Sequence, residues 1–86
     1  MTDLEILEKI KSMSNYTGNF HDDFLLGWIE EAKDKLYDSG VSKEAIERNC
    51  GGVIALIVID ETENGGLTEK TEKRIAQKAL SFPRGD

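Results

Sequence analysis

Apolar residues in this 86-residue chain fall into stripes at helical spacing, apart from one run that is apolar on every side. Residues three and four positions apart share one face of an α-helix, whereas an unbroken apolar run leaves no polar face. The run occupies residues 53–59 and follows a glycine pair at positions 51–52. It predicts a segment buried on all sides. In so short a chain we expect partner chains to help bury it.

Two amphipathic helices are predicted before this run. The first covers residues 3–12 and follows a possible capping box, in which Thr2 and Glu5 satisfy each other's backbone amides. The second begins at the acidic pair Asp22 and Asp23, which suits the positive end of a helix dipole. It ends at Gly40, because glycine readily adopts the left-handed backbone that closes a helix.

The run itself is predicted to belong to one long third helix over residues 42–62, capped by Ser42. The glycine pair would let a neighbouring element approach closely. A buried strand is the alternative, since Val and Ile favour strands, but no other segment is available to pair with it. Residues 64–66 predict a turn, and Thr68 the cap of a last helix that Pro83 ends.

The chain is therefore predicted to be all-α, a small bundle of about four helices with a long apolar third helix. It forms a single domain over residues 1–86, with a short tail at 81–86. Seven apolar side chains are expected in the core or in an interface: Val53, Ile54, Ile57, Val58, Phe24, Trp28 and Ile29. An exposed aromatic patch formed by Phe20, Phe24 and Trp28 is the alternative for the second helix.

Charge and composition restrict the classes of function that the chain can have. The chain carries 17 acidic and 11 basic residues, a net charge of −6, which disfavours a module that grips nucleic acid. An acidic surface is compatible with DNA sliding past it. The single cysteine, Cys50, excludes an intrachain disulfide. No secretory signal or membrane-spanning run is found, so a cytoplasmic protein is expected.

Candidate chemistry is sparse. His21 beside Asp22 and Asp23 resembles a metal-ligand cluster, but adjacent helical residues point apart, and capping of a helix is favoured. Cys50 is in phase with Ile46 and Val53, which favours core packing over a nucleophile. No catalytic, metal or cofactor site is predicted, and no small-molecule substrate.

One charged stripe stands out on the last predicted helix. Lys70, Arg74 and Lys78 are spaced four residues apart, so they lie along one face. This possible contact stripe could touch nucleic acid or an acidic neighbour. It could equally be a solvated face balanced by Glu69 and Glu72.

The order of these stretches resembles the small head–tail connector proteins of tailed bacteriophages and prophages. The likeness runs from about residue 4 to residue 80 and rests on order and spacing. It lies in residues 4–11, 17–23, 26–33, 39–41, 52–60, 66–68 and 73–80. The chain departs from the family at residues 61–64, which lack the aromatic residue often found there.

The resemblance implies a structural subunit of the phage neck, a cyclic homo-oligomer between the portal and a head-completion or tail protein. The packaged DNA would pass through the lumen without sequence-specific binding. The expected location is the virion neck, and the host bacterial cytoplasm during assembly. The alternative class is a small helical regulator or adaptor of prophage origin that binds one protein partner.

Overall fold

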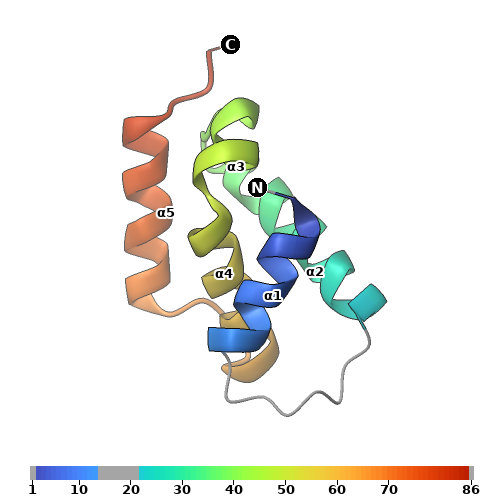
Figure 1. Ribbon diagram of the computed structural model, residues 1–86. Coiled ribbons are helices and arrows are strands. Elements are labelled where there is room, and N and C mark those ends of the chain that lie inside the picture. Colours follow the sequence, from blue (N-terminus) through green and yellow to red (C-terminus); the bar gives the residue numbers. More distant parts are fainter. Residues whose placement is uncertain (1, 14–21, 86) are drawn as a thin grey trace.

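The computed structural model describes residues 2–13 and 22–85, and these residues form five helices (Figure 1). The all-α class is thus confirmed, but the number of helices is five rather than four. In chain order they are α1 (Asp3–Met13), α2 (Asp22–Asp38), α3 (Lys43–Asn49), α4 (Gly51–Glu63) and α5 (Glu69–Ser81).

The long apolar third helix is wrong, because the chain leaves the helical path at Cys50. The backbone there has φ −112° and ψ 11°, so α3 ends at Asn49 and α4 begins at Gly51. The two glycines at 51–52 have low helix propensity, which makes this the weakest point for continuing a helix. The apolar run is helical, so the strand alternative is also wrong, but α4 has only 13 residues. The longest helix, the 17-residue α2, is amphipathic.

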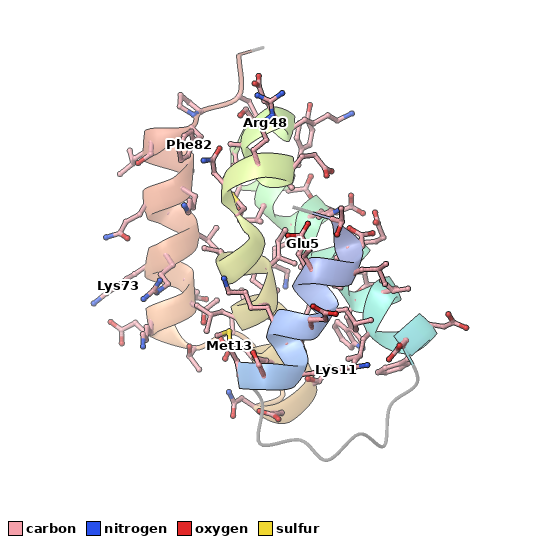
Figure 2. The ribbon with its side chains drawn as sticks, viewed as in Figure 1. Glu5, Lys11, Met13, Arg48, Lys73 and Phe82 are labelled. Carbon is pink, nitrogen blue, oxygen red and sulfur yellow. The ribbon has the colours of Figure 1, made fainter. Side chains whose placement is uncertain are left out.

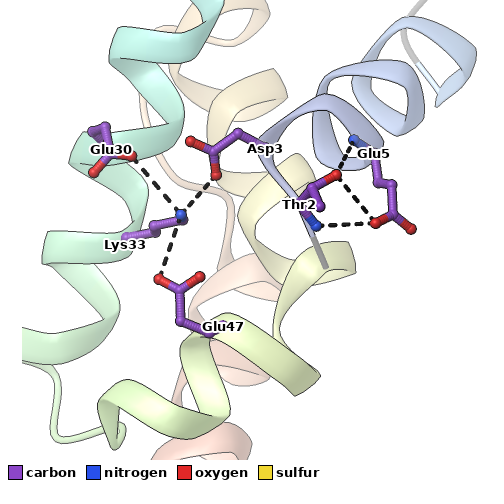
Figure 3. Close-up of polar contacts among 6 residues, drawn as sticks. All are labelled: Thr2, Asp3, Glu5, Glu30, Lys33 and Glu47. Atoms are coloured by element: carbon purple, nitrogen blue, oxygen red, sulfur yellow. Dashed lines mark hydrogen bonds and ion pairs between the residues drawn. The ribbon is translucent and has the colours of Figure 1, made fainter.

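Three helices begin at the capping residues that the sequence predicts. The amide of Glu5 donates to Thr2 Oγ1 at 3.2 Å and the amide of Thr2 donates to Glu5 Oε1 at 3.0 Å, which is the predicted capping box (Figure 3). Ser42 and Thr68 each accept, through the hydroxyl, the amide of the residue three positions on, at 3.3 Å in both cases. The caps of α1, α3 and α5 are therefore confirmed.

The predicted turns are confirmed as well. Gly40 follows α2 with φ 103°, and Gly65 lies between α4 and α5 with φ 73°. Both values are in the left-handed region that side chains with a Cβ rarely adopt, so these two positions favour glycine.

Helix α4 occupies the centre of the bundle and packs against each of the other four helices (Figure 1). Val53 is 4% exposed and Ile57 2%, while Ile54 and Val58 are fully buried. All four are covered by this one chain. A partner is therefore not needed to bury the apolar run, and the expectation of partner chains loses that support.

The aromatic residues of α2 separate into core and surface. The helix buries the stripe Leu25, Ile29, Ala32 and Leu36. Phe24 is one residue off this stripe and 47% exposed, so its expected place in the core is corrected. Its ring meets the half-buried Trp28 edge to face, with centroids 6.2 Å apart. Phe20, the third member of the aromatic alternative, lies outside the described residues.

One lysine joins three helices on the side of the bundle away from α5. Lys33 Nζ lies 2.7 Å from Asp3, 3.5 Å from Glu47 and 3.8 Å from Glu30, so it links α1, α2 and α3 (Figure 3). Partial burial alone would lower the pKa of Lys33, but the hydrogen bond to Asp3 and the three carboxylate charges raise it. This network fastens the outer helices around α4.

Candidate functional site

The position of α5 creates the candidate site, because this helix is held mainly at its two ends. At its start the buried Asp60 accepts the amide and hydroxyl of Thr68, both at 3.0 Å, and the Asn64 side chain at 3.1 Å. At its end the tail bonds to the α2–α3 connection, since the amide of Ser42 donates to the carbonyl of Phe82 at 2.9 Å. Between these anchors α5 packs chiefly on α4.

Hydrogen bonds preserve the charge of Asp60 although the residue is buried. Asp60 is only 5% exposed to solvent. Burial alone would raise the pKa of the Asp60 carboxyl, but the hydrogen bonds from Thr68 and Asn64 hold that pKa below its ordinary value. The carboxylate is therefore ionised at neutral pH and fixes the entry of α5.

A groove runs between α5 and α1, with α4 as its floor, and we call it the α1/α4/α5 groove. Helix α4 lies between the other two and keeps them apart (Figure 1). The groove encloses about 400 Å³. The groove is lined by residues of these three helices and by the last residue of α3: Lys9, Met13, Asn49, Gly52, Val53, Leu56, Lys70, Arg74 and Lys78.

The floor of the groove is apolar. Met13, at the end of α1, is 45% exposed and its side chain contributes one wall (Figure 2). Leu56, one of two half-buried members of the apolar run, lines the groove together with the buried Val53. A Cβ at Gly52 would meet no atom within 4 Å, so the expected close approach of a neighbour at this glycine does not occur.

The rim of the groove is basic on both sides. The predicted stripe Lys70, Arg74 and Lys78 lines the α5 side, and Lys9 adds a cation from α1. The structure thus places the stripe on one surface and joins it to an apolar floor. Sequence analysis missed Lys9 and Met13, because only the packing of α1 against α4 brings them there.

Three of the four rim cations differ from the other cations of the described residues. Elsewhere lysines and arginines pair with carboxylates at 2.7–3.4 Å: Lys11–Asp22, Lys33–Asp3, Lys35–Glu61, Arg48–Glu44 and Lys73–Glu69. Three more lie over aromatic rings: Lys43 and Arg84 over Tyr37, and Lys78 over Phe82.

The remaining three cations of the described chain are Lys9, Lys70 and Arg74, and all three line the groove. None has a carboxylate partner among the described residues, although acidic residues outnumber basic ones by 17 to 11 in the sequence. Lys70 and Arg74 also sit four residues apart, where like charges repel. The arrangement does not stabilise the isolated chain, so its cations are open to an external anion.

A second hollow, between α2 and α4, lacks this character. It encloses about 220 Å³ and is lined by Trp28, Glu31, Ala32, Lys35, Ile57 and Glu61. Its one cation is already bonded, since Lys35 Nζ lies 2.9 Å from Glu61 Oε1. The α1/α4/α5 groove is therefore the stronger candidate for a binding surface.

Other residues considered for chemistry are placed as follows. Cys50 is fully buried, and burial raises the pKa of its thiol, an effect that the charge of Lys78 only partly offsets. The thiol is therefore protonated at neutral pH. His21 lies outside the described residues. Within residues 2–13 and 22–85, no three His, Cys, Asp or Glu side chains converge to hold a metal ion.

Comparison with protein-family models, with curated proteins and with solved structures finds no significant match to this chain. None of the helices in the described ranges combines the length and apolar character required to traverse a bilayer.

Proposed function

We propose that this protein is a structural, non-enzymatic subunit of the phage neck, which forms a ring between the portal and the tail through which DNA passes. The observation that carries the proposal is the α1/α4/α5 groove, an apolar floor edged by three cations without partners among the described residues. Such a surface suits contact with another protein. The order and spacing of the helical stretches, which resemble the connector family, supply the second support.

The acidic balance of the chain agrees with a DNA channel. A net charge of −6 repels phosphate backbones at distances within the Debye length, about 8 Å at physiological salt. DNA would thus move past the subunit without being held. A ring also needs two different, complementary faces on each subunit, because its contacts are head to tail.

A second candidate function rests on a different observation. The apolar run is buried within one chain, since Ile54, Ala55 and Val58 are fully covered without a partner. A subunit with a complete core can act as a monomer. The alternative is therefore a small helical regulator or adaptor that binds one protein through the same groove.

Light scattering coupled to size-exclusion chromatography separates the two candidates. The pure protein is run across a concentration series, alone and after mixing with a purified phage portal ring. The neck-subunit proposal expects a discrete cyclic oligomer, either in isolation or on the portal. A chain that stays monomeric or dimeric at every concentration and leaves the portal unbound contradicts that proposal and supports the regulator.

A further inference from the structure

We infer that the α1/α4/α5 groove binds an acidic amphipathic helix from another protein, with apolar side chains on the floor and carboxylates on the rim. This inference rests on the proposed function only in treating the chain as a protein-binding subunit. It does not require a ring, so the groove and the ring can fail separately.

The apolar floor of the groove calls for apolar side chains on the partner helix. Met13 and Leu56 present an apolar surface that is open to solvent in the isolated chain, and the buried Val53 adds to its lining. Covering such a surface is favourable in proportion to its apolar area. Two neighbouring helices already form its walls, so a third helix with an apolar stripe completes the packing in the way that grooves accept amphipathic helices.

The basic rim of the groove calls for carboxylates on the partner helix. Lys70 and Lys78 are eight residues apart, about 12 Å at the helical rise of 1.5 Å per residue. Lys9 lies on the opposite side of the groove. A helix of two to three turns fits this length and can present carboxylates to both rims at once. Since Lys9, Lys70 and Arg74 have no carboxylate partner among the described residues, these contacts break no existing ion pair.

A second copy of this chain is a poorer occupant than a different protein. Its exposed acidic stripe on α2 comprises Glu31, Asp34 and Asp38, and the only strongly exposed apolar side chain on that face in the described residues is Phe24, two turns before Glu31. A single aromatic ring at one end of that stripe would leave most of the floor of the groove uncovered. A ring of copies would therefore be held together by other faces, and the groove would take a different protein.

Duplex DNA is a poorer occupant as well. Binding to phosphates alone would use the rim and leave the apolar floor exposed. The chemistry of the groove as a whole therefore favours a protein helix.

The test uses synthetic peptides and the full chain. The probe is a short helical peptide with leucines three and four residues apart and glutamates elsewhere, labelled for fluorescence anisotropy. The comparison peptide carries lysine in place of every glutamate. Backbone NMR then locates binding. We expect the glutamate peptide to shift the amides of Met13, Gly52 and Leu56, and the lysine peptide to leave them unchanged.

Two variants supply the control. The double variant Lys70→Glu, Arg74→Glu should weaken binding of the glutamate peptide about tenfold or more, by turning attraction into repulsion at both rim positions. Lys73→Glu is the matched control, because Lys73 lies on the same helix but points away from the bundle and pairs with Glu69 (Figure 2). It should change the affinity less than about twofold.

Several results would overturn the inference. These are no binding of the glutamate peptide, equal losses in the Lys73→Glu and double variants, or tighter binding of a short DNA duplex in the groove. Association of the chain with itself through the groove, seen as the same amide shifts on raising its own concentration, would assign the groove to a second copy. A failure to form rings, with peptide binding intact, would count against the neck subunit alone.

Discussion

Helices α4 and α5 have the same length, 13 residues, but opposite relations to the rest of the chain. Seven residues of α4 are buried and only two of α5, Thr71 and Ile75. The first helix is surrounded by the other four, whereas the second rests on α4 along a narrow stripe (Figure 1). The difference teaches that α4 specifies the fold, while α5 offers most of its surface for contacts outside the chain.

The largest expected effect comes from placing a charge inside α4. Ile57→Asp puts an uncompensated carboxylate at a position that is 2% exposed. We expect a loss of at least about 4 kcal/mol in the free energy of unfolding, a large fraction of the total stability of a small domain. Circular dichroism during urea unfolding measures it. Ile57→Val, the matched control, should cost only about 1 kcal/mol. An unchanged melting temperature in Ile57→Asp would refute the central position of α4.

The next largest effect lies at the junction between the two helices. Asp60→Asn turns one of the two acceptor oxygens into an NH2 donor, so the side chain can no longer accept from Thr68 and Asn64 through separate oxygens. We expect a loss of about 1–3 kcal/mol in stability at pH 7, because a buried hydrogen-bond network loses a charged member. The loss should appear first as faster amide exchange in residues 69–81, before the rest of the bundle is affected.

The same substitution predicts a pH dependence. The folded-state pKa of Asp60 is held below its ordinary value of 3.8, so its contribution to stability is complete above that value. As the pH falls through the lowered folded-state pKa, the carboxylate is protonated and the contribution is lost. The stability difference between wild type and Asp60→Asn should therefore shrink on acidification below about pH 4. A difference that stays constant down to pH 2 would exclude the depressed pKa.

A smaller effect is expected from the Lys33 ion pairs, which join the helices around α4. Lys33→Ala removes the cation that joins Asp3, Glu30 and Glu47. We expect a loss of about 1 kcal/mol, because the lysine is only partly buried and water screens its ion pairs. The effect should diminish in high salt. Salt-independent destabilisation would show that the packing of the lysine stem, and not its charge, is responsible.

The smallest effect is expected on the outer side of α5. Leu80 is 84% exposed, so Leu80→Ser should change the free energy of unfolding by less than about 0.5 kcal/mol. Thermal denaturation of the two proteins at equal concentration measures this. A loss above about 1.5 kcal/mol would place Leu80 in a buried contact and remove the contrast between α4 and α5.

Local rules accounted for much of the fold. The caps at Thr2, Ser42 and Thr68 and the turn at Gly40 were predictable, because each depends on residues within four positions. The helical nature of the apolar run was also predictable, since no other segment could pair with it as a strand. The break at Cys50 was not, because a glycine pair weakens a helix without determining whether it ends.

Tertiary packing decided the remainder. Phe24 lies off the buried stripe of α2 by a single residue, and periodicity alone cannot separate core from edge at that margin. The stripe Lys70, Arg74 and Lys78 was visible in the sequence. Its place beside Lys9 and Met13 depends on contacts between helices far apart in the chain, which no local pattern encodes.

Hydrogen exchange on the pure chain, at a dilution where light scattering shows a monomer, tests the central claim most directly. If one chain buries the apolar run, the amides of residues 55–63 should exchange only through global unfolding, more slowly than those of α5. Rapid exchange in α4 of the monomer, with protection appearing only at concentrations where chains associate, would contradict the account. It would show that partner chains are needed to bury the run.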